Sequence, residues 1–321
     1  MNARRLVVAL LCGALWALYG AVALAAPAMP RGLPALNVAA LAASDNHLYV
    51  GSFDAGLYIV DRAGNARHFE DPALSRHINA LAWSERERTL WLGTARGVTR
   101  CRMVAPALCT RLGPVSAVHA LLLRADGSLL AGGDAGVTFI APSSLQTQTQ
   151  TIGKKQAAPY RSVWALAESA DGTLFVGATN GLFWGSATAI AQGNVKLERA
   201  AVVLGNLPDD WVTALLLQGN SLHVGTYNAG VASFALDAGS LRATTNDPGA
   251  GYVNPAGLFG VDDGKLAVSS MTGLRVGAAD KTLLLETQAR DITALAPAHA
   301  GGSWVGTRQG LEWTPLALRG S

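Results

Sequence analysis

The chain has 321 residues, of which 15% are charged and half are apolar, and it contains 36 glycines and 13 prolines. Many glycines in an apolar chain with little charge disfavour disordered and helical classes and favour an all-β protein with short strands and tight turns. The net charge of +3 does not indicate the clustered basic surface that nucleic acid or an anionic membrane requires.

The first 25 residues predict a secretory signal peptide. Arg4 and Arg5 form a short positive region, an apolar run extends from Leu6 to Leu24, and a small-residue cleavage pattern ends at Ala25. Without those two arginines, 23 of the 25 basic residues remain, against 22 acidic ones. We expect an exported bacterial protein, periplasmic or secreted, with no membrane span after cleavage. An uncleaved anchor is the alternative, because about 19 apolar residues can cross a bilayer.

A phrase of about ten residues then recurs seven times. The copies are LYVGSFDAGL (48–57), LWLGTARGV (90–98), LLAGGDAGV (129–137), LFVGATNGL (174–182), LHVGTYNAGV (222–231), LAVSSMTGL (266–274) and SWVGTRQGL (303–311). The mean period of about 42 residues is that of one four-stranded propeller blade. Seven such units need nearly all of residues 26–321, so the sequence predicts a single domain, a seven-bladed β-propeller of four-stranded antiparallel blades.

Two glycines in each copy have different predicted roles. The second, such as Gly181 or Gly230, follows a strand and supplies the positive φ that a short hairpin turn requires. The first, such as Gly93 or Gly225, lies within a strand, where glycine usually marks the close approach of another backbone. A phosphate-binding loop is disfavoured, since the chain has no GxxxxGK motif.

Two cysteines remain after signal removal, Cys101 and Cys109. In an exported chain this even number favours a disulfide across a hairpin, and two free thiols are the alternative.

The phrase ADGTLFVGATNGL (170–182), with NLPDDWVTALL (206–216) as the type of segment that precedes it, resembles the repeat of the two-component regulator propeller family. The resemblance covers essentially the whole mature chain. It is weaker in the sixth copy, where Ser269 replaces the first glycine and Pro255 enters the first strand, and in the third, where Gly133 replaces threonine. The resemblance implies a ligand-binding propeller of the kind found in periplasmic sensors, here as a stand-alone sensor-like or scaffold protein. Related propeller families include lyases and lactonases, so the fold alone does not exclude an enzyme.

Familiar catalytic and metal motifs are absent from the sequence. There is no GxSxG, no HExxH and no cysteine pair at zinc spacing, and the six histidines are scattered along the chain. Asp209-Asp210 and Asp262-Asp263 are candidate cation ligands, but the second pair lies in VDDGK, where aspartate suits a hairpin turn, and the turn interpretation is favoured. No cofactor and no metal are predicted.

The loop-rich end of the propeller is the predicted binding surface. There the turns after the second strands meet the segments that enter the first strands, and these carry aromatic rings, arginines and amides suited to stacking on sugars or holding a peptide. The candidate residues are Phe53, Asp54, Arg76, His77, Arg96, Asp134, Tyr160, Arg161, Asn180, Trp211, Tyr227, Asn228, Tyr252, Arg308 and Gln309.

The leading hypothesis is therefore a non-catalytic propeller that binds an oligosaccharide, a peptide or an envelope protein. A propeller enzyme is the rival, and it requires hydrogen-bonding contact among some of His77, Asp54, Asp134 and Asp209. A structural envelope subunit is a third hypothesis, and it predicts a broad apolar patch. Either LALR (316–319) or RGLPALN (31–37) could close the ring as an outer strand.

Overall fold

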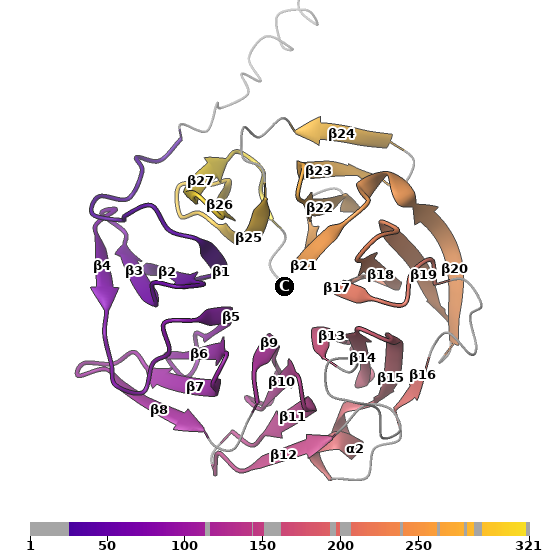
Figure 1. The fold of residues 1–321 in the computed structure, drawn as a ribbon, viewed down its shortest axis with the longest axis horizontal. Coiled ribbons are helices and arrows are strands. Elements are labelled where there is room, and N and C mark those ends of the chain that lie inside the picture. Colours follow the sequence, from indigo (N-terminus) through magenta and orange to yellow (C-terminus); the bar gives the residue numbers. More distant parts are fainter. Residues whose placement is uncertain are drawn as a thin grey trace, which may run out of the picture.

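The computed structural model describes residues 26–112, 116–142, 144–150, 162–192, 197–199, 207–237, 240–261, 264–278, 281–285 and 291–318. These residues form seven antiparallel sheets in which the strands follow one another in chain order. Figure 1 shows the sheets arranged as a ring, with the first strand of each near the centre. The predicted signal peptide, residues 1–25, lies outside the described residues.

The first four sheets contain strands β1 to β16. The first has β1 (Val38–Ala43), β2 (His47–Ser52), β3 (Leu57–Asp61) and β4 (Ala66–Phe69). The second has β5 (Ile78–Ser84), β6 (Thr89–Thr94), β7 (Gly97–Arg102) and β8 (Leu108–Leu112). The third has β9 (Val118–Leu123), β10 (Leu129–Gly133), β11 (Gly136–Ile140) and β12 (Thr147–Gln150). The fourth has β13 (Val163–Glu168), β14 (Thr173–Ala178), β15 (Gly181–Ser186) and β16 (Glu198–Arg199), with the short helix α2 (Ala187–Ala191) after β15.

The last three sheets contain strands β17 to β27. The fifth has β17 (Val212–Gln218), β18 (Ser221–Thr226), β19 (Val231–Asp237) and β20 (Ser240–Asp247), followed by the 3-10 turn η2 (Pro248–Ala250). The sixth has β21 (Val253–Gly260), β22 (Leu266–Ser270), β23 (Gly273–Ala278) and β24 (Lys281–Leu285). The seventh has β25 (Ile292–Pro297), β26 (Ser303–Thr307) and β27 (Gly310–Thr314). The all-β fold and the seven sheets are confirmed, although the seventh has three strands among the described residues.

The repeated phrase forms the second strand of each sheet and the turn into the third. Each second glycine has a positive φ, and these glycines are Gly56, Gly97, Gly136, Gly181, Gly230, Gly273 and Gly310. At Gly230 a side chain is also excluded by space, because a Cβ atom would lie 2.0 Å from the carbonyl oxygen of Asp247. The turn role predicted for the second glycine is confirmed.

The first glycine of the phrase admits a side chain from the next sheet. A Cβ atom on Gly177 would lie 2.5 Å from Cγ1 of Val212, and one on Gly225 would lie 2.6 Å from Cγ1 of Val253. We predicted that another backbone approaches this glycine. A close approach is present, but a side chain makes it, so that part of the prediction was wrong. At six of the seven junctions the β-branched residue that begins the next inner strand fills the space instead, and its stiff side chain suits a fixed contact.

The hydrophobic core lies between sheets. One cluster combines Phe175 and Leu182 of the fourth sheet with Val212, Val224 and Phe234 of the fifth. Such clusters stabilise a sheet only when its neighbour is in place, because each sheet by itself leaves an apolar face in water.

The ring closes by contact between the seventh and first sheets. The hydroxyl of Thr293 in β25 donates a hydrogen bond to the carbonyl of Val38 in β1 (2.6 Å), and a Cβ on Gly306 would lie 2.5 Å from Cγ1 of Val38. Neither of the two predicted closing segments pairs with β27 within the described residues. Leu318 forms an isolated bridge with Val261 beside β21, and Arg31 forms one with Asn65 before β4.

An ion pair joins the third and fourth sheets at the end away from the repeated turns. Arg124 donates from Nε and Nη2 to the two carboxylate oxygens of Glu168, at 2.8 and 2.7 Å. Both side chains are largely buried, and this two-point geometry is the strongest form of a carboxylate–guanidinium contact.

The predicted disulfide is confirmed. Cys101 in β7 and Cys109 in β8 face one another across the hairpin and are bonded.

We expect Gly177→Ala to lower the free energy of unfolding by about 1–3 kcal/mol, because the added methyl group overlaps Val212 in a packed interface. Urea denaturation measures the change. In a Val212→Ala background the same substitution should cost about 1 kcal/mol less, because the overlapping methyl groups are gone. Equal costs in the two backgrounds would show that Gly177 does not serve to admit Val212.

Removal of the disulfide by Cys101→Ser with Cys109→Ser should lower the free energy of unfolding by about 2–3 kcal/mol, as the chain-entropy model gives for so short a loop. Denaturation with and without reductant measures it. Reductant should produce the same loss in the unmodified protein and no further loss in the double variant. A double variant as stable as the oxidised protein would contradict a stabilising role.

Candidate functional site

One end of the ring, here called the mouth, is formed by the turns between second and third strands. The first residues of these turns are Phe53, Ala95, Asp134, Thr179, Tyr227, Met271 and Arg308. Backbone hydrogen bonds fix several of them against the entries to the inner strands, as from Phe53 N to Asn37 O (2.9 Å) and from Tyr227 N to Trp211 O (2.9 Å). The same turn backbone therefore presents seven different side chains.

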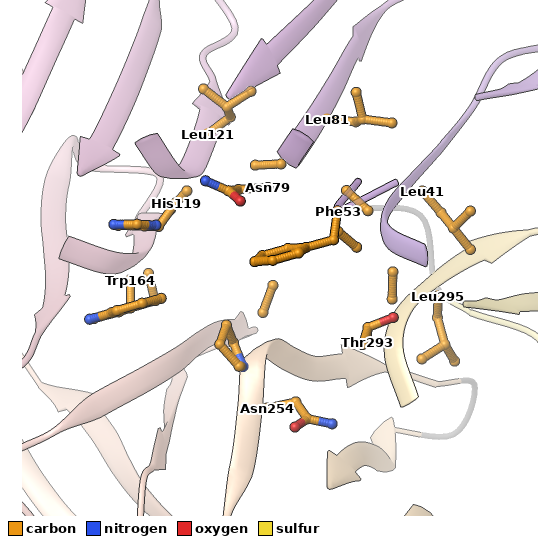
Figure 2. A pocket seen from close by; sticks show the side chains of 18 of the residues that line it. Leu41, Phe53, Asn79, Leu81, His119, Leu121, Trp164, Asn254, Thr293 and Leu295 are labelled. Carbon is orange, nitrogen blue, oxygen red and sulfur yellow. The ribbon is translucent and has the colours of Figure 1, made fainter. Parts of the chain in front are cut away.

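A cavity of about 600 Å³ opens at the mouth and extends along the axis. Inner strands from all seven sheets contribute to its wall. Its volume falls within the range of about 300–1,000 Å³ that is usual for small-molecule sites. Figure 2 shows the ring of Phe53 within it, between a wall that carries His119 and Trp164 and another that carries Leu41 and Leu295.

The second residue of each inner strand decides how neighbouring sheets are joined near the axis. In four sheets this residue donates a hydrogen bond to the carbonyl of the β-branched residue that begins the next inner strand. The pairs are Asn79 to Val118, Thr213 to Val253, Asn254 to Ile292 and Thr293 to Val38. The other three sheets have Ala39, His119 and Trp164 at this position, and all three side chains line the cavity.

His119 and Trp164 form one wall of the cavity. Their rings stack with centroids 4.2 Å apart and planes 17° from parallel. Nε2 of His119 lies 2.9 Å from Oδ1 of Asp134, and the same oxygen accepts a hydrogen bond from Ser162 Oγ at 2.7 Å. Asp134 therefore orients the imidazole that supports the indole.

Asp134 remains charged because its partners stabilise the carboxylate. Partial burial by itself would raise the pKa of Asp134, but the hydrogen bonds from Ser162 and His119 outweigh burial and hold that pKa below its ordinary value. Asp134 does not line the cavity, whereas His119 does.

Aromatic rings continue from this wall around the mouth. Trp164 and Trp211 have centroids 6.2 Å apart, Trp211 stacks on Tyr227 at 4.1 Å with planes 8° from parallel, and Tyr227 meets Tyr252 edge-on at 4.9 Å. We call these four residues, together with His119, the aromatic arc. Such half-buried faces provide contact area with few rotatable bonds.

Polar groups lie among these rings. The indole Nε1 atoms of Trp164 and Trp211 and Oδ1 of Asn180 are buried and have no hydrogen-bond partner among the described residues. Burial raises the pKa of Tyr252, Tyr227 adds to the rise, and Arg308 opposes it. The guanidinium of Arg308 is therefore part of the same electrostatic environment.

The predicted site residues occupy three kinds of position. Four line the cavity, namely Phe53, His77, Tyr252 and Arg308. Asp54, Arg76, Arg96, Asn228 and Gln309 are exposed at the turns, while Asp134, Asn180, Trp211 and Tyr227 are half-buried beside the cavity. Tyr160 and Arg161, like Asp262 and Asp263, lie outside the described residues.

His119 and Trp164 were absent from the predicted site, and Asn79, Asn254 and Thr293 were also missed. The signal that could have found the first two is a comparison of the inner strands VAALAA, INALAW, VHALLL, VWALAE, VTALLL, VNPAGL and ITALAP. Histidine and tryptophan stand where other strands have small or hydrogen-bonding residues.

The residues required by the enzyme hypothesis make separate contacts. Asp54 accepts a hydrogen bond from Ser52 Oγ (2.8 Å), and Asp209 accepts the backbone N–H groups of Trp211 and Asn228. His77 lies against Phe53, with ring centroids 3.8 Å apart. Among the described residues, no hydrogen bond joins any two of Asp54, His77, Asp134 and Asp209, and no group of three or more potential metal ligands occurs.

Exposed large apolar side chains occur in several parts of the described chain. Phe53 and Met271 lie at the mouth, Val104 lies between β7 and β8, Leu108 begins β8, and Met29 lies before β1. In the described ranges, no helix combines the length and apolar character needed to cross a membrane.

No family model and no curated protein matches the sequence. Solved structures match the fold. The extracellular domain of the putative one-component system BT4673 from B. thetaiotaomicron superimposes with a TM-score of 0.69 at 16% identity, over 89% of this chain and 39% of that chain. PorZ, a surface component of the type-IX secretion system of Porphyromonas gingivalis, gives 0.64 at 14%, over 90% of this chain and 39% of its own.

The WD40 β-propeller domain of Doa1 also gives a TM-score of 0.64, at 14% identity over 89% of this chain and 94% of that chain. The chain thus spans about two fifths of the first two proteins and nearly all of the Doa1 domain. At these identities the similarity shows the fold, a β-propeller.

We expect the free energy of unfolding to fall less steeply with falling pH in Asp134→Asn than in the unmodified protein. The pKa of Asp134 is lower in the folded state than the ordinary value of 3.8, so the unfolded state binds more protons between the two values. The stabilisation is complete above about pH 5 and is lost as pH falls through the folded-state pKa. Urea unfolding from about pH 6 to pH 3 measures it, with Ser162→Ala expected to be intermediate. Parallel stability curves for Asp134→Asn and the unmodified protein would contradict this assignment.

Proposed function

We propose that this protein is an exported, non-catalytic β-propeller that binds an oligosaccharide or a peptide across its mouth, as a sensor-like or scaffold component. The proposal includes membership of the two-component regulator propeller repeat family, a signal peptide at residues 1–25 and a single domain at residues 26–321. An envelope protein could present the recognised segment.

The main support is the convergence of varied side chains at one end of a uniform ring. The aromatic arc borders a cavity of about 600 Å³, and the turns beside it present Arg308, Asn228 and Asp54. Flat rings stack on sugar faces and on peptide side chains, while guanidinium and amide groups fix orientation. Further support comes from two similar structures, the extracellular domain of a putative one-component system and a bacterial surface component.

A propeller enzyme of the lyase or lactonase type, with a divalent metal at the axis, is the second candidate. The observation that favours it is that His119 lines the cavity and has its Nε2 2.9 Å from Oδ1 of Asp134, since a carboxylate-oriented imidazole can transfer protons. It requires metal ligands in addition to this pair.

A thermal-shift screen of the purified protein against oligosaccharides, peptides and divalent metals tests the proposal. A ligand at 100 times its Kd should add about 2.7 kcal/mol of stability. Trp211→Ala should weaken binding of the ligand found by about two- to tenfold, the loss expected for one stacked ring.

Trp83→Ala is the matched control, because Trp83 lies at the far end of β5 from the mouth and hydrogen-bonds to Glu85. It should leave binding unchanged. Stabilisation by calcium or magnesium, with none by any sugar or peptide, would reject the proposal and favour the enzyme.

A further inference from the structure

We propose that the axial cavity binds the apolar chain of an anionic amphiphile and that Arg308 holds its carboxylate at the rim. This inference rests on the proposed function in one respect, the use of the mouth as the binding end. It concerns a different part of that end, because Trp211 and Tyr227 of the aromatic arc do not line the cavity.

The deep wall of the cavity is apolar on nearly every side. The fourth residue of an inner strand is leucine in six of the sheets that line it, namely Leu41, Leu81, Leu121, Leu166, Leu215 and Leu295. Four of these, Leu81, Leu121, Leu166 and Leu215, are only half-buried, so part of their surface faces the cavity. Figure 2 shows Leu41, Leu81, Leu121 and Leu295 around it.

Small alanine side chains lie nearer the mouth than the leucines and leave the cavity wider there. Ala40, Ala80, Ala120, Ala165 and Ala294 precede the leucines and also line the cavity. The polar donors Asn79, Asn254 and Thr293 lie nearer the mouth, and each already uses its side chain to bond the next sheet. A ligand that reaches the leucines therefore finds few free hydrogen-bonding groups, which favours an apolar chain over a sugar at this depth.

The charged side chain in the cavity wall is positive. Among the described residues that line the cavity, Arg308 is the one with a permanent charge, and no aspartate or glutamate is present. Arg308 is exposed in the turn between β26 and β27 and has no carboxylate within ion-pair distance in the described chain. A guanidinium at the rim of an apolar well is suited to a planar carboxylate.

Phe53 and His77 complete the entrance on the side of the first two sheets. The ring of Phe53 is 47% exposed and projects into the cavity beside His77. This position lets Phe53 pack along the first methylenes of a bound chain. The predicted chemistry, an apolar chain that ends in a carboxylate, is available from a free carboxylic acid or from a peptide with an apolar C-terminal residue.

Isothermal titration of the purified protein with acetate, hexanoate, octanoate and decanoate tests the inference. Affinity should rise by up to about fourfold for each added methylene group, and acetate should not bind measurably. Decyltrimethylammonium, with the opposite charge and an alkyl chain one methylene longer, should bind at least about tenfold more weakly than decanoate, which corresponds to about 1.4 kcal/mol. A peptide ending in leucine, compared with its C-terminal amide, distinguishes a polypeptide terminus from a free acid as the source of the carboxylate.

Arg308→Gln should weaken decanoate binding about tenfold and should not weaken decyltrimethylammonium binding. Arg242→Gln is the matched control, because Arg242 is exposed in β20 and does not line the cavity. It should change neither affinity. Thermal unfolding of both variants verifies that the fold is retained.

Three results would overturn the inference. They are equal affinities for decanoate and decyltrimethylammonium, binding of acetate as tight as that of decanoate, and an unchanged decanoate affinity in Arg308→Gln. If sugars or peptides bind in a Trp211-dependent manner and no carboxylate binds, this inference fails and the proposed function stands. If decanoate binds in an Arg308-dependent manner and no sugar or peptide does, the proposed function fails instead.

Discussion

The contact between a glycine in the second strand of one sheet and a β-branched residue at the start of the next is the constraint on which the ring depends. A Cβ atom at any of Gly51, Gly93, Gly132, Gly177, Gly225 and Gly306 would lie 2.4–2.8 Å from a methyl carbon of the following sheet. The last of these contacts joins the seventh sheet to the first. It therefore closes the ring without an outer strand from either terminal segment of the described chain, and Thr293 adds a hydrogen bond at the same junction.

This packing contact allows the residue types at the mouth to vary from turn to turn. The glycine and its β-branched partner position the turn backbone by sterics and main-chain hydrogen bonds, so the type of the first side chain can differ from turn to turn, even though Asp134 also joins the third and fourth sheets. Phenylalanine, aspartate, tyrosine and arginine can all occupy that position. Binding residues are usually found on such loops, held by a rigid scaffold.

The second residue of an inner strand either joins its sheet to the next one or leaves its side chain facing the cavity. Asn79, Thr213, Asn254 and Thr293 join neighbouring sheets near the axis, whereas His119 has its Nε2 bonded to Asp134 within its own sheet. Other contacts join the third and fourth sheets. Ser162 donates to Asp134 across the junction between them, and Arg124 pairs with Glu168 at the far end of that junction. These contacts hold the two sheets together and allow His119 and Trp164 to face the cavity.

The sequence by itself determined the number of repeats, the strands, the turn glycines and the disulfide, because each depends on contacts between residues close in the chain. It also identified the end of the propeller where varied residues gather, including Phe53, His77, Tyr252 and Arg308 of the cavity wall. Only the tertiary structure decided which residues share that cavity, since Trp164 meets His119, and Arg308 acts on Tyr252, only when neighbouring sheets pack together. The first glycine of the repeat was predicted to approach a backbone, and the structure places a valine or isoleucine side chain there, because blade-to-blade packing joins residues about 30 positions apart that no local pattern connects.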